Sequence, residues 1–480
     1  MNLTTALLAR CRPAGWWSLL AGLLALSRPA GAQTALPSPL TLPQALAAAR
    51  TNYPLLRARQ ASVQAAQADV RTQRANYLPQ VNAQLQAVDA TVNQVRGAFI
   101  GGVAIPISGG IKTTPYNDQT AFTSLGALSI EWPAVTFGRY RADEVRSQAV
   151  VSAAQADYDQ AVFEHQTQVA DAYLLALGAD KSVALQRANL ARAQALGRVI
   201  RAGAASGIRP GIDSATVNAE ISSARLQLLA SRQRAQQQHT RLAGLLGTPT
   251  QAVAIDSMQF YTKLPQAPPL PAVLDTARLN PLLQAYHQRV VANAAYTKLL
   301  LTNKRPTFSL LGSTWARGSG VNDRANEDGS FNINSSPGAG LPFKAYDFMV
   351  GATLTWHLTE LLHSGYAAQA QRLRTVESQA VYSQQALQLQ TEQQNATLQL
   401  ELAAETARQA PVQLSAARQA YRQARARYDA GLDNLLVLTQ ATAVLNRAET
   451  DQALATNNLW RALLLRAATT GDLKPLLGQL

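Results

Sequence analysis

The amino-acid sequence predicts a mainly α-helical protein made of long helical hairpins, with four β-strands and an internal duplication. Two stretches, 138–202 and 365–430, are rich in Ala, Gln and Arg and read as continuous helix. Two pairs of shorter segments alternate apolar and polar residues, as strands do. The same order of elements recurs at an offset near 227 residues, which indicates a structural repeat.

Residues 1–32 have the features of a secretory signal peptide. Arg10 and Arg12 precede an apolar core over 16–26, and Ala30-Gly31-Ala32 forms a small-residue cleavage motif. An uncleaved anchor is the alternative. Cys11 is the only cysteine, so we expect the mature chain to have no disulfide and no thiol chemistry. Loss of the leader, which also contains Arg28, lowers the formal net charge from +14 to +11.

The first helix is expected to begin after Thr41, which can act as the N-cap. Pro43 suits the first turn, and Gln44 is placed to complete a capping box. The helical pattern continues to about residue 77, with a bend at Pro54, and Pro79 ends it.

A first strand pair is predicted over about 81–133. Val81 and Leu85 alternate with polar residues in the first strand, and Leu128, Ile130 and Trp132 do so in the second. One apolar and one polar face suit a strand between lipid and water. A half-buried strand of a soluble sheet has the same alternation, so both interpretations stay open at this point.

The helix over 138–202 would be about 100 Å long at 1.5 Å per residue, which is typical of a rod or a tube. A turn containing Gly203 and Gly207 follows, and Asp213 is predicted to cap the next helix, which runs to about residue 246. This turn is the first predicted tip of the molecule. A Pro-rich connector over 248–272 then leads to the second half.

The second half repeats this plan. Pro281 and Pro306 stand where Pro54 and Pro79 stood, and strands are expected over 307–315 and 346–358, separated by a polar surface loop at 318–340. The second long helix ends at Gly431, with Asp433 or Asn434 as cap of a last helix to about residue 469. The predicted organisation is a signal peptide (1–32), a first repeat (33–247), the connector (248–272), a second repeat (273–470, strand pair about 307–358) and a tail (471–480).

Four strands cannot close a barrel, since single-chain barrels begin at about eight strands. An open sheet edge in lipid leaves unpaired backbone groups at several kcal/mol each. If these strands cross a membrane, several copies of the chain must combine them.

The sequence contains no pattern typical of an enzyme, a metal site or a cofactor site. Its five histidines are scattered, and it has no nucleophile elbow and no phosphate loop. The arginines are spread along helices without an aromatic-rich basic patch, which argues against nucleic acid as a partner. We therefore predict no catalytic residues, no metal and no cofactor.

Nearly all of the mature chain resembles the TolC-type outer-membrane efflux protein family. The resemblance is carried by LTLPQALAAARTNYPLLRARQASVQAAQADV at the start, by the strand pairs, by RYDAGLDNLLVLTQATAVLNRAE at the second tip, and by the duplication. It implies a homotrimer with a 12-stranded β-barrel in the outer membrane, continued by an α-helical tube in the periplasm. It also implies that the tips dock on a periplasmic adaptor (membrane fusion) protein linked to an inner-membrane pump.

The resemblance also implies roles for particular residues. The docking tips would contain Gly203, Gly207, Arg209, Asp213, Arg427, Tyr428, Gly431 and Asp433. The positions that carry an acidic ring in some members are Val437 and Gln440 here, so an acidic gate is not expected at this possible constriction. The aromatic belt at the membrane would contain Trp132, Trp315, Tyr346 and Trp356, for which core packing is the alternative.

Two functions follow as hypotheses. The first is an outer-membrane exit duct of a tripartite efflux or type I secretion system, which conducts small molecules or a polypeptide passively. The second is a periplasmic or secreted coiled-coil scaffold. The four alternating segments discriminate between them, because a rod has no use for strands placed symmetrically between its helices.

Overall fold

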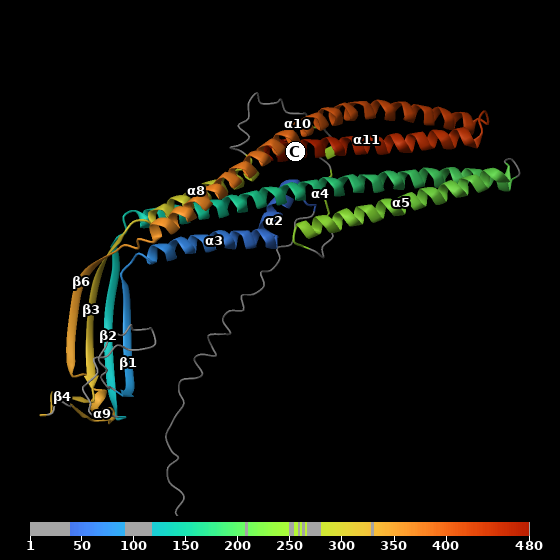
Figure 1. The fold of residues 1–480 in the computed structure, drawn as a ribbon. Coiled ribbons are helices and arrows are strands. Elements are labelled where there is room, and N and C mark those ends of the chain that lie inside the picture. Colours follow the sequence, from blue (N-terminus) through green and yellow to red (C-terminus); the bar gives the residue numbers. More distant parts are fainter. Residues whose placement is uncertain are drawn as a thin grey trace, which may run out of the picture.

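The computed structural model describes residues 39–91, 118–206, 210–248, 254–257, 260–261, 265, 280–327 and 331–479. The predicted signal peptide, Gly207, Arg209 and most of the predicted connector lie outside these residues. A four-stranded sheet forms one end of the elongated molecule, and two pairs of helices reach the far end (Figure 1). None of the helices in the described ranges has the length and hydropathy needed to cross a membrane.

The first helical region is two helices, α2 (Leu42–Asn52) and α3 (Pro54–Ala75), separated at Tyr53. Tyr53 is extended because the residue before a proline is kept out of the helical region. The predicted capping box is present, and the Thr41 backbone N–H donates to Gln44 Oε1 at 3.1 Å. The predicted bend at Pro54 is thus a complete break.

Two long helices run the length of the helical region: α4 (Arg139–Ala205) and α10 (Glu360–Asp429). The second begins before the predicted residue 365, because helical bonds already start at residues 360–363. Each turns back at its far end into a shorter helix, α5 (Gly211–Leu245) and α11 (Leu435–Thr470). These are the two predicted hairpins.

Helix α4 is flanked by α3 near the sheet and by α5 near the tip, one after the other (Figure 1). In the same way α8 (Pro281–Thr302) and then α11 occupy the space between α4 and α10. The wall is therefore four helices wide at both levels: α3, α4, α8 and α10 near the sheet, and α5, α4, α11 and α10 near the tips.

The places where α5 meets α3 and where α11 meets α8 have the same construction. At the first junction, His165 Nε2 of α4 lies 3.0 Å from the Leu245 carbonyl oxygen at the end of α5. At the second, Gln393 Nε2 of α10 donates to the Thr469 carbonyl oxygen at 3.0 Å, near the end of α11. In each case a side chain of the long helix binds one of the free carbonyls at a helix end.

At each junction, the N-cap residue of the helix nearer the sheet, α3 or α8, makes a further contact. Tyr53, the N-cap of α3, stacks on the His165 ring with centroids 3.8 Å apart. Asn280, the N-cap of α8, accepts from the Leu282 N–H at 2.9 Å and donates to the Thr469 carbonyl at 3.1 Å. Each short helix is thereby held in line with the end of a hairpin.

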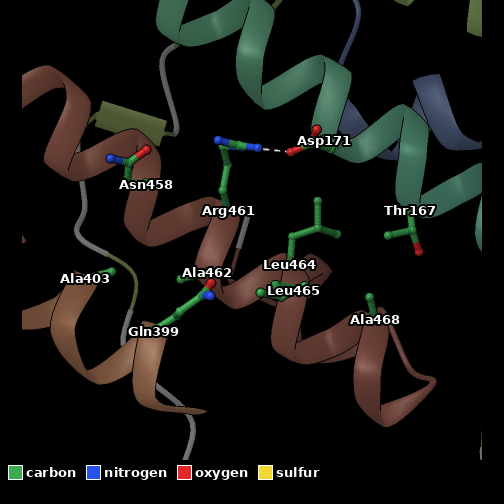
Figure 2. Close-up of a pocket in the computed structure, with 10 residues that line it drawn as sticks. All are labelled: Thr167, Asp171, Gln399, Ala403, Asn458, Arg461, Ala462, Leu464, Leu465 and Ala468. Atoms are coloured by element: carbon green, nitrogen blue, oxygen red, sulfur yellow. Dashed lines mark hydrogen bonds and ion pairs between the residues drawn. The ribbon is translucent and has the colours of Figure 1, made fainter. Parts of the chain in front are cut away.

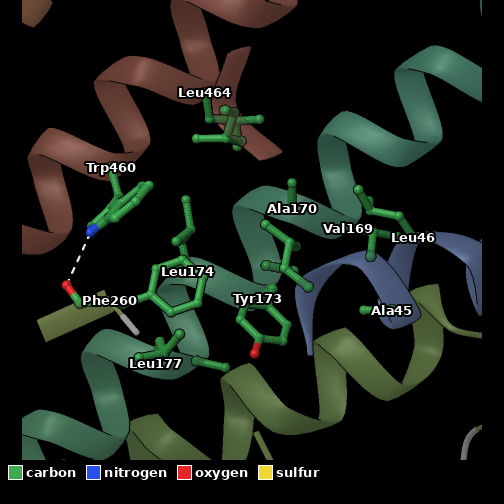
Figure 3. Packing of buried hydrophobic residues seen from close by; sticks show 14 of the residues in the cluster. Ala45, Leu46, Val169, Ala170, Tyr173, Leu174, Leu177, Phe260, Trp460 and Leu464 are labelled. Atoms are coloured by element: carbon green, nitrogen blue, oxygen red, sulfur yellow. Dashed lines mark hydrogen bonds between the residues drawn. The ribbon is translucent and has the colours of Figure 1, made fainter. Parts of the chain in front are cut away.

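The main hydrophobic core lies at the middle of the molecule, where α2, the first hairpin and the C-terminal part of α11 meet. Tyr173, Phe260 and Trp460 form a chain of ring contacts through it (Figure 3). Trp460 Nε1 donates to the Phe260 carbonyl at 3.0 Å, and the Tyr173 hydroxyl to the Leu40 carbonyl at 2.9 Å. The segments around Leu40 and Phe260 are thus fixed to the two hairpins. The chain continues past α11 into the short helix α12 (Lys474–Leu477), and Leu476 is buried in the same core.

The sheet contains β1 (Gln80–Thr91), β2 (Thr120–Val135), β3 (Thr307–Ser319) and β6 (Ala345–Thr355), in the order β1-β2-β3-β6 and all antiparallel. This confirms the two predicted strand pairs. Both outer strands, β1 and β6, have one edge without a strand partner among the described residues.

The segment predicted to be a polar surface loop, 318–340, is structured in large part. It contains a small hairpin of β4 (Val321–Ala325) and β5 (Phe331–Ile333) and a one-turn helix, α9 (Pro337–Gly340). Helix α9 lies against β2 and β3 at the end of the sheet that is distant from the long helices. Backbone and hydroxyl hydrogen bonds hold it there. Polar composition alone did not indicate these contacts.

Candidate functional site at the sheet face and the helical tips

The sheet has one apolar face that is open to its surroundings. The strand register places Val81, Ile130, Gly312 and Val350 in one row across all four strands, and Ala83, Leu128, Thr314 and Phe348 in the next. Leu85 is 81% exposed, and Phe348 and Val350 are 83% exposed. The rows that alternate with these point to the opposite face and carry polar residues, including Ser129, Ser313 and Glu131.

Three of the four predicted belt aromatics lie on or next to this apolar face. Trp132 pairs with Leu310, Tyr346 pairs with Ala316, and Trp356 follows the end of β6 with the same alternation. The indole N–H of Trp132 donates to the Tyr77 carbonyl at 3.2 Å, and that of Trp356 to the Lys304 carbonyl at 3.1 Å. These two side chains are therefore anchored where α3 and α8 meet the sheet.

The fourth, Trp315, lies on the polar face, so its predicted place in the belt is wrong. Its register partners are Ala127 and Asp347, which alternate with the apolar residues. The sequence of β3 mixes apolar and polar residues on both faces, so its alternation alone did not reveal its orientation. The pairing with β2 and β6 decides it.

The second tip is a tight helix-ending turn at Gly431, as predicted. Gly431 has φ of +75°, its N–H donates to the Tyr428 carbonyl, and the Leu432 N–H donates to the Arg427 carbonyl at 2.9 Å. This is the Schellman arrangement, which places glycine in the left-handed region. Of the two predicted caps, Asn434 is used: its side chain accepts from the Val437 N–H at 3.2 Å.

Asp433 has a different partner. Arg427 Nε donates to Asp433 Oδ2 at 2.7 Å and Arg427 Nη2 donates to Oδ1 at 3.2 Å. The hydrogen bond from Arg427 lowers the pKa of the Asp433 carboxyl, and the carboxylate in turn raises the pKa of Arg427. The pair spans the turn from the last residues of α10 to the residue before the Asn434 cap.

Tyr428 was predicted at the docking surface, but it is buried. It is 1% exposed and packs with Ile200 of α4, Val217 of α5, and Leu435 and Leu438 of α11. The apolar side chains that the tip does present outward are Leu432, 69% exposed, and Leu436, 61% exposed. Val437 and Gln440 are exposed in the first turns of α11.

The first tip differs from its prediction in one respect. Helix α5 begins at Gly211 with Pro210 as its N-cap, so Asp213 lies inside the first turn and is not the cap. Proline fixes φ near −65°, which starts the helix before Asp213 is reached. An acidic residue in the first turn is still favourable next to the positive helix end. Gly203 lies within the last turn of α4.

Two ion pairs connect the hairpins, and neither could be predicted from the sequence. Arg192 of α4 and Glu449 of α11 form a bidentate pair with a shortest distance of 2.7 Å, and both are largely buried. Arg461 of α11 donates to Asp171 of α4 at 2.8 Å. Their partners are 257 and 290 residues apart, beyond any local pattern.

The Asp171–Arg461 pair forms part of the wall of a cavity of about 480 Å³ between α4, α10 and α11 (Figure 2). Apart from this pair the cavity is lined by aliphatic and neutral polar side chains: Thr167, Gln399, Ala403, Asn458, Ala462, Leu464, Leu465 and Ala468. The part of the chain that the structure describes contains no group of three or more residues suited to hold a metal ion.

Comparisons with known proteins agree with this architecture. A family model described as "Outer membrane efflux protein" matches residues 45–248. Among solved structures, the outer-membrane channel OprN is 21% identical with a TM-score of 0.68, and 90% of each chain is covered. VceC of Vibrio cholerae is 17% identical with a TM-score of 0.68, covering 90% of this chain and 96% of that one.

The open state of MtrE from Neisseria gonorrhoeae is 17% identical with a TM-score of 0.70, covering 90% of this chain and 89% of that one. No curated protein matches the chain. The resemblance to TolC-type outer-membrane efflux proteins, predicted from the sequence, is therefore confirmed: residues 45–248 match that family, and nine tenths of the chain share the fold of these solved channels.

Proposed function

We propose that the protein is the outer-membrane exit duct of a tripartite efflux or type I secretion system. The observation that carries this proposal is the sheet. It has an apolar face open to its surroundings, two edges without a strand partner in the part of the chain that the structure describes, and long helical hairpins attached at one end. Lipid would cover the apolar face, since contiguous exposed apolar surface of this extent marks an interaction site. A coiled-coil scaffold would leave this face without a function.

The two edges of the sheet, on β1 and β6, support an assembly of several copies. Three copies joined edge to edge, β1 of one against β6 of the next, would give 12 strands and satisfy the backbone groups that lipid cannot. The helices of the three copies would form the tube in the periplasm. Trp132 and Trp356 would lie at the periplasmic boundary of the membrane and Tyr346 toward the outer one, as aromatic girdles do.

The tips would dock on a periplasmic adaptor protein that links the duct to an inner-membrane pump. Leu432 and Leu436 offer exposed apolar side chains, and the Arg427–Asp433 pair holds the turn that presents them. Val437 and Gln440 would line the constriction. A wide water-filled conduit conducts passively, so we assign it no catalytic residues.

Imaging of the detergent-extracted protein from the outer-membrane fraction tests the duct. The proposal predicts a three-fold particle with a barrel at one end and a tube about 100 Å long, the length of α4 at 1.5 Å per residue. A soluble, extended dimer or filament absent from that membrane would contradict the duct and favour the scaffold.

A substitution at the second tip tests docking. Gly431→Val places a β-branched residue at positive φ, whereas Gly431→Asn is a matched control because Asn tolerates this region. Among the described residues, chain neighbours apart, no heavy atom lies within 4 Å of an added Cβ, so we expect the effect to come from the backbone. We expect Val, but not Asn, to reduce transport by the assembled system while the trimer persists. Unchanged transport with Val would contradict the role of this tip.

A further inference from the structure

A segment that the sequence showed only as a loop covers the far end of the apolar sheet face. We call residues 334–344 the strap; it contains α9 and leads into β6. The Ser124 hydroxyl of β2 donates to the Leu341 carbonyl at 2.9 Å, and the Lys344 N–H donates to the Arg317 carbonyl of β3 at 2.8 Å. The strap is thus attached to both central strands.

Glycines beneath and within the strap allow this close approach. A Cβ on Gly318 would collide with the Pro342 carbonyl, and a Cβ on Gly340 would collide with the Phe122 carbonyl. The Phe343 ring lies over Gly126, where an added Cβ would be 2.9 Å from it. The strap therefore has a fitted position on the sheet.

The strap changes the chemistry of the surface that it covers. One row beneath it holds only small residues, Ala87, Ser124 and Gly318, and the next pairs the charged Asp89 with Phe122. The large apolar side chains that the strap exposes are Leu341, 42% exposed, and Phe343, 38% exposed. The Phe343 ring lies over Gly126, in the row of Leu85, Ala316 and Tyr346, so it continues the apolar face.

The length of the apolar face along the strands is slightly too short for a membrane without the strap. Between the rows of Leu354 and Tyr346 the face extends about 27 Å along the strands at 3.4 Å per residue. At the usual strand tilt of about 40° this gives a height of about 21 Å, whereas the apolar band of an outer-membrane barrel is about 25 Å tall. One further row, covered by the strap, supplies the difference.

We propose that the strap is part of the lipid-facing surface, with Leu341 and Phe343 in contact with acyl chains at the outer end of the apolar band. This inference rests on the proposed function, because it requires the sheet to be in a membrane. The occupant is lipid, since the exposed strap side chains are continuous with a face that is apolar across all four strands.

Site-specific fluorescence tests this proposal. Cys11 is the only cysteine and lies in the predicted signal peptide, so each cysteine introduced into the mature chain is the single site of labelling. Phe343→Cys, labelled with an environment-sensitive fluorophore, is reconstituted in phosphatidylcholine vesicles. Its quenching by nitroxide on the lipid acyl chain is compared with quenching by aqueous iodide. Phe348→Cys reports the uncovered apolar face, and Ser313→Cys reports the polar face.

We expect the label at 343 to lose fluorescence with acyl-chain nitroxide to an extent comparable with the label at 348, and the label at 313 to respond only to iodide. Lipid quenching at 348 with only iodide quenching at 343 would overturn the strap proposal and leave the duct intact. Quenching of 343 by neither reagent would overturn it in favour of a protein contact. No lipid quenching at either position would refute the membrane location itself.

Discussion

The two helix junctions have the same plan, but they are closed by different chemistry. At the first, a single side chain, His165, serves the Leu245 carbonyl, and Tyr53 stacks on it. At the second, Gln393 and Asn280 both donate to the Thr469 carbonyl. The first junction therefore depends on one titratable ring, and the second on two neutral amides that can partly replace one another.

The two junctions should respond differently to acid. Burial lowers the pKa of the His165 imidazole, and its hydrogen bond to Leu245 opposes this only in part. The amides of the second junction do not titrate. Acid should therefore weaken the first hairpin's attachment to α3 and leave the attachment of the second hairpin to α8 unchanged.

Truncation at the first junction should have the largest effect. His165→Ala removes a buried, stacked ring and leaves the Leu245 carbonyl without its donor, so we expect a loss of about 3 kcal/mol in the free energy of unfolding. Gln393→Ala leaves Asn280 on the Thr469 carbonyl and should cost about 1 kcal/mol. Denaturant unfolding followed by circular dichroism compares them. Equal losses would contradict the redundancy of the second junction.

The cap of α8 should have an intermediate effect. Asn280→Ala removes both the cap of α8 and a donor to Thr469, for an expected loss of about 1.5 kcal/mol. Asn280→Asp keeps the capping oxygen and loses only the donor, so it separates the two contributions in the same unfolding measurement. If Asp were as destabilising as Ala, the cap would contribute nothing.

The pH dependence should be the smallest effect and the sharpest test of the comparison. The folded state binds the His165 proton more weakly than the unfolded state. The contribution of His165 to the free energy of unfolding is therefore fully present above its unfolded pKa of about 6.5. It is lost as the pH falls from there toward the lower folded value. Unfolding at a series of pH values from about 8 to 5 should show this loss in the native protein.

His165→Gln is the matched control, because it places at the first junction the amide that the second already uses. We expect the variant to keep a donor for the Leu245 carbonyl and to show a smaller loss of stability over the same pH range. A pH profile identical to that of the native protein would place the acid sensitivity elsewhere in the chain.

Features set by a few neighbouring residues could be predicted from the sequence. The Thr41–Gln44 capping box and the turn at Gly431 depend on contacts within one helical turn, and the structure has both, whereas the bend expected at Pro54 is a complete break. The four strands could also be predicted, since alternation is a local signal. The order of these elements along the chain sufficed for the resemblance to the channel family.

Tertiary structure decided the features whose partners are distant in the chain. Strand pairing placed Trp315 on the polar face, packing between hairpins buried Tyr428, and the strap became apolar surface through its contacts with β2 and β3. His165 meets Leu245 80 residues away, and Arg192 meets Glu449 257 residues away. Long helices rich in Ala, Gln and Arg look alike on every face, so only the folded arrangement shows which side chains meet.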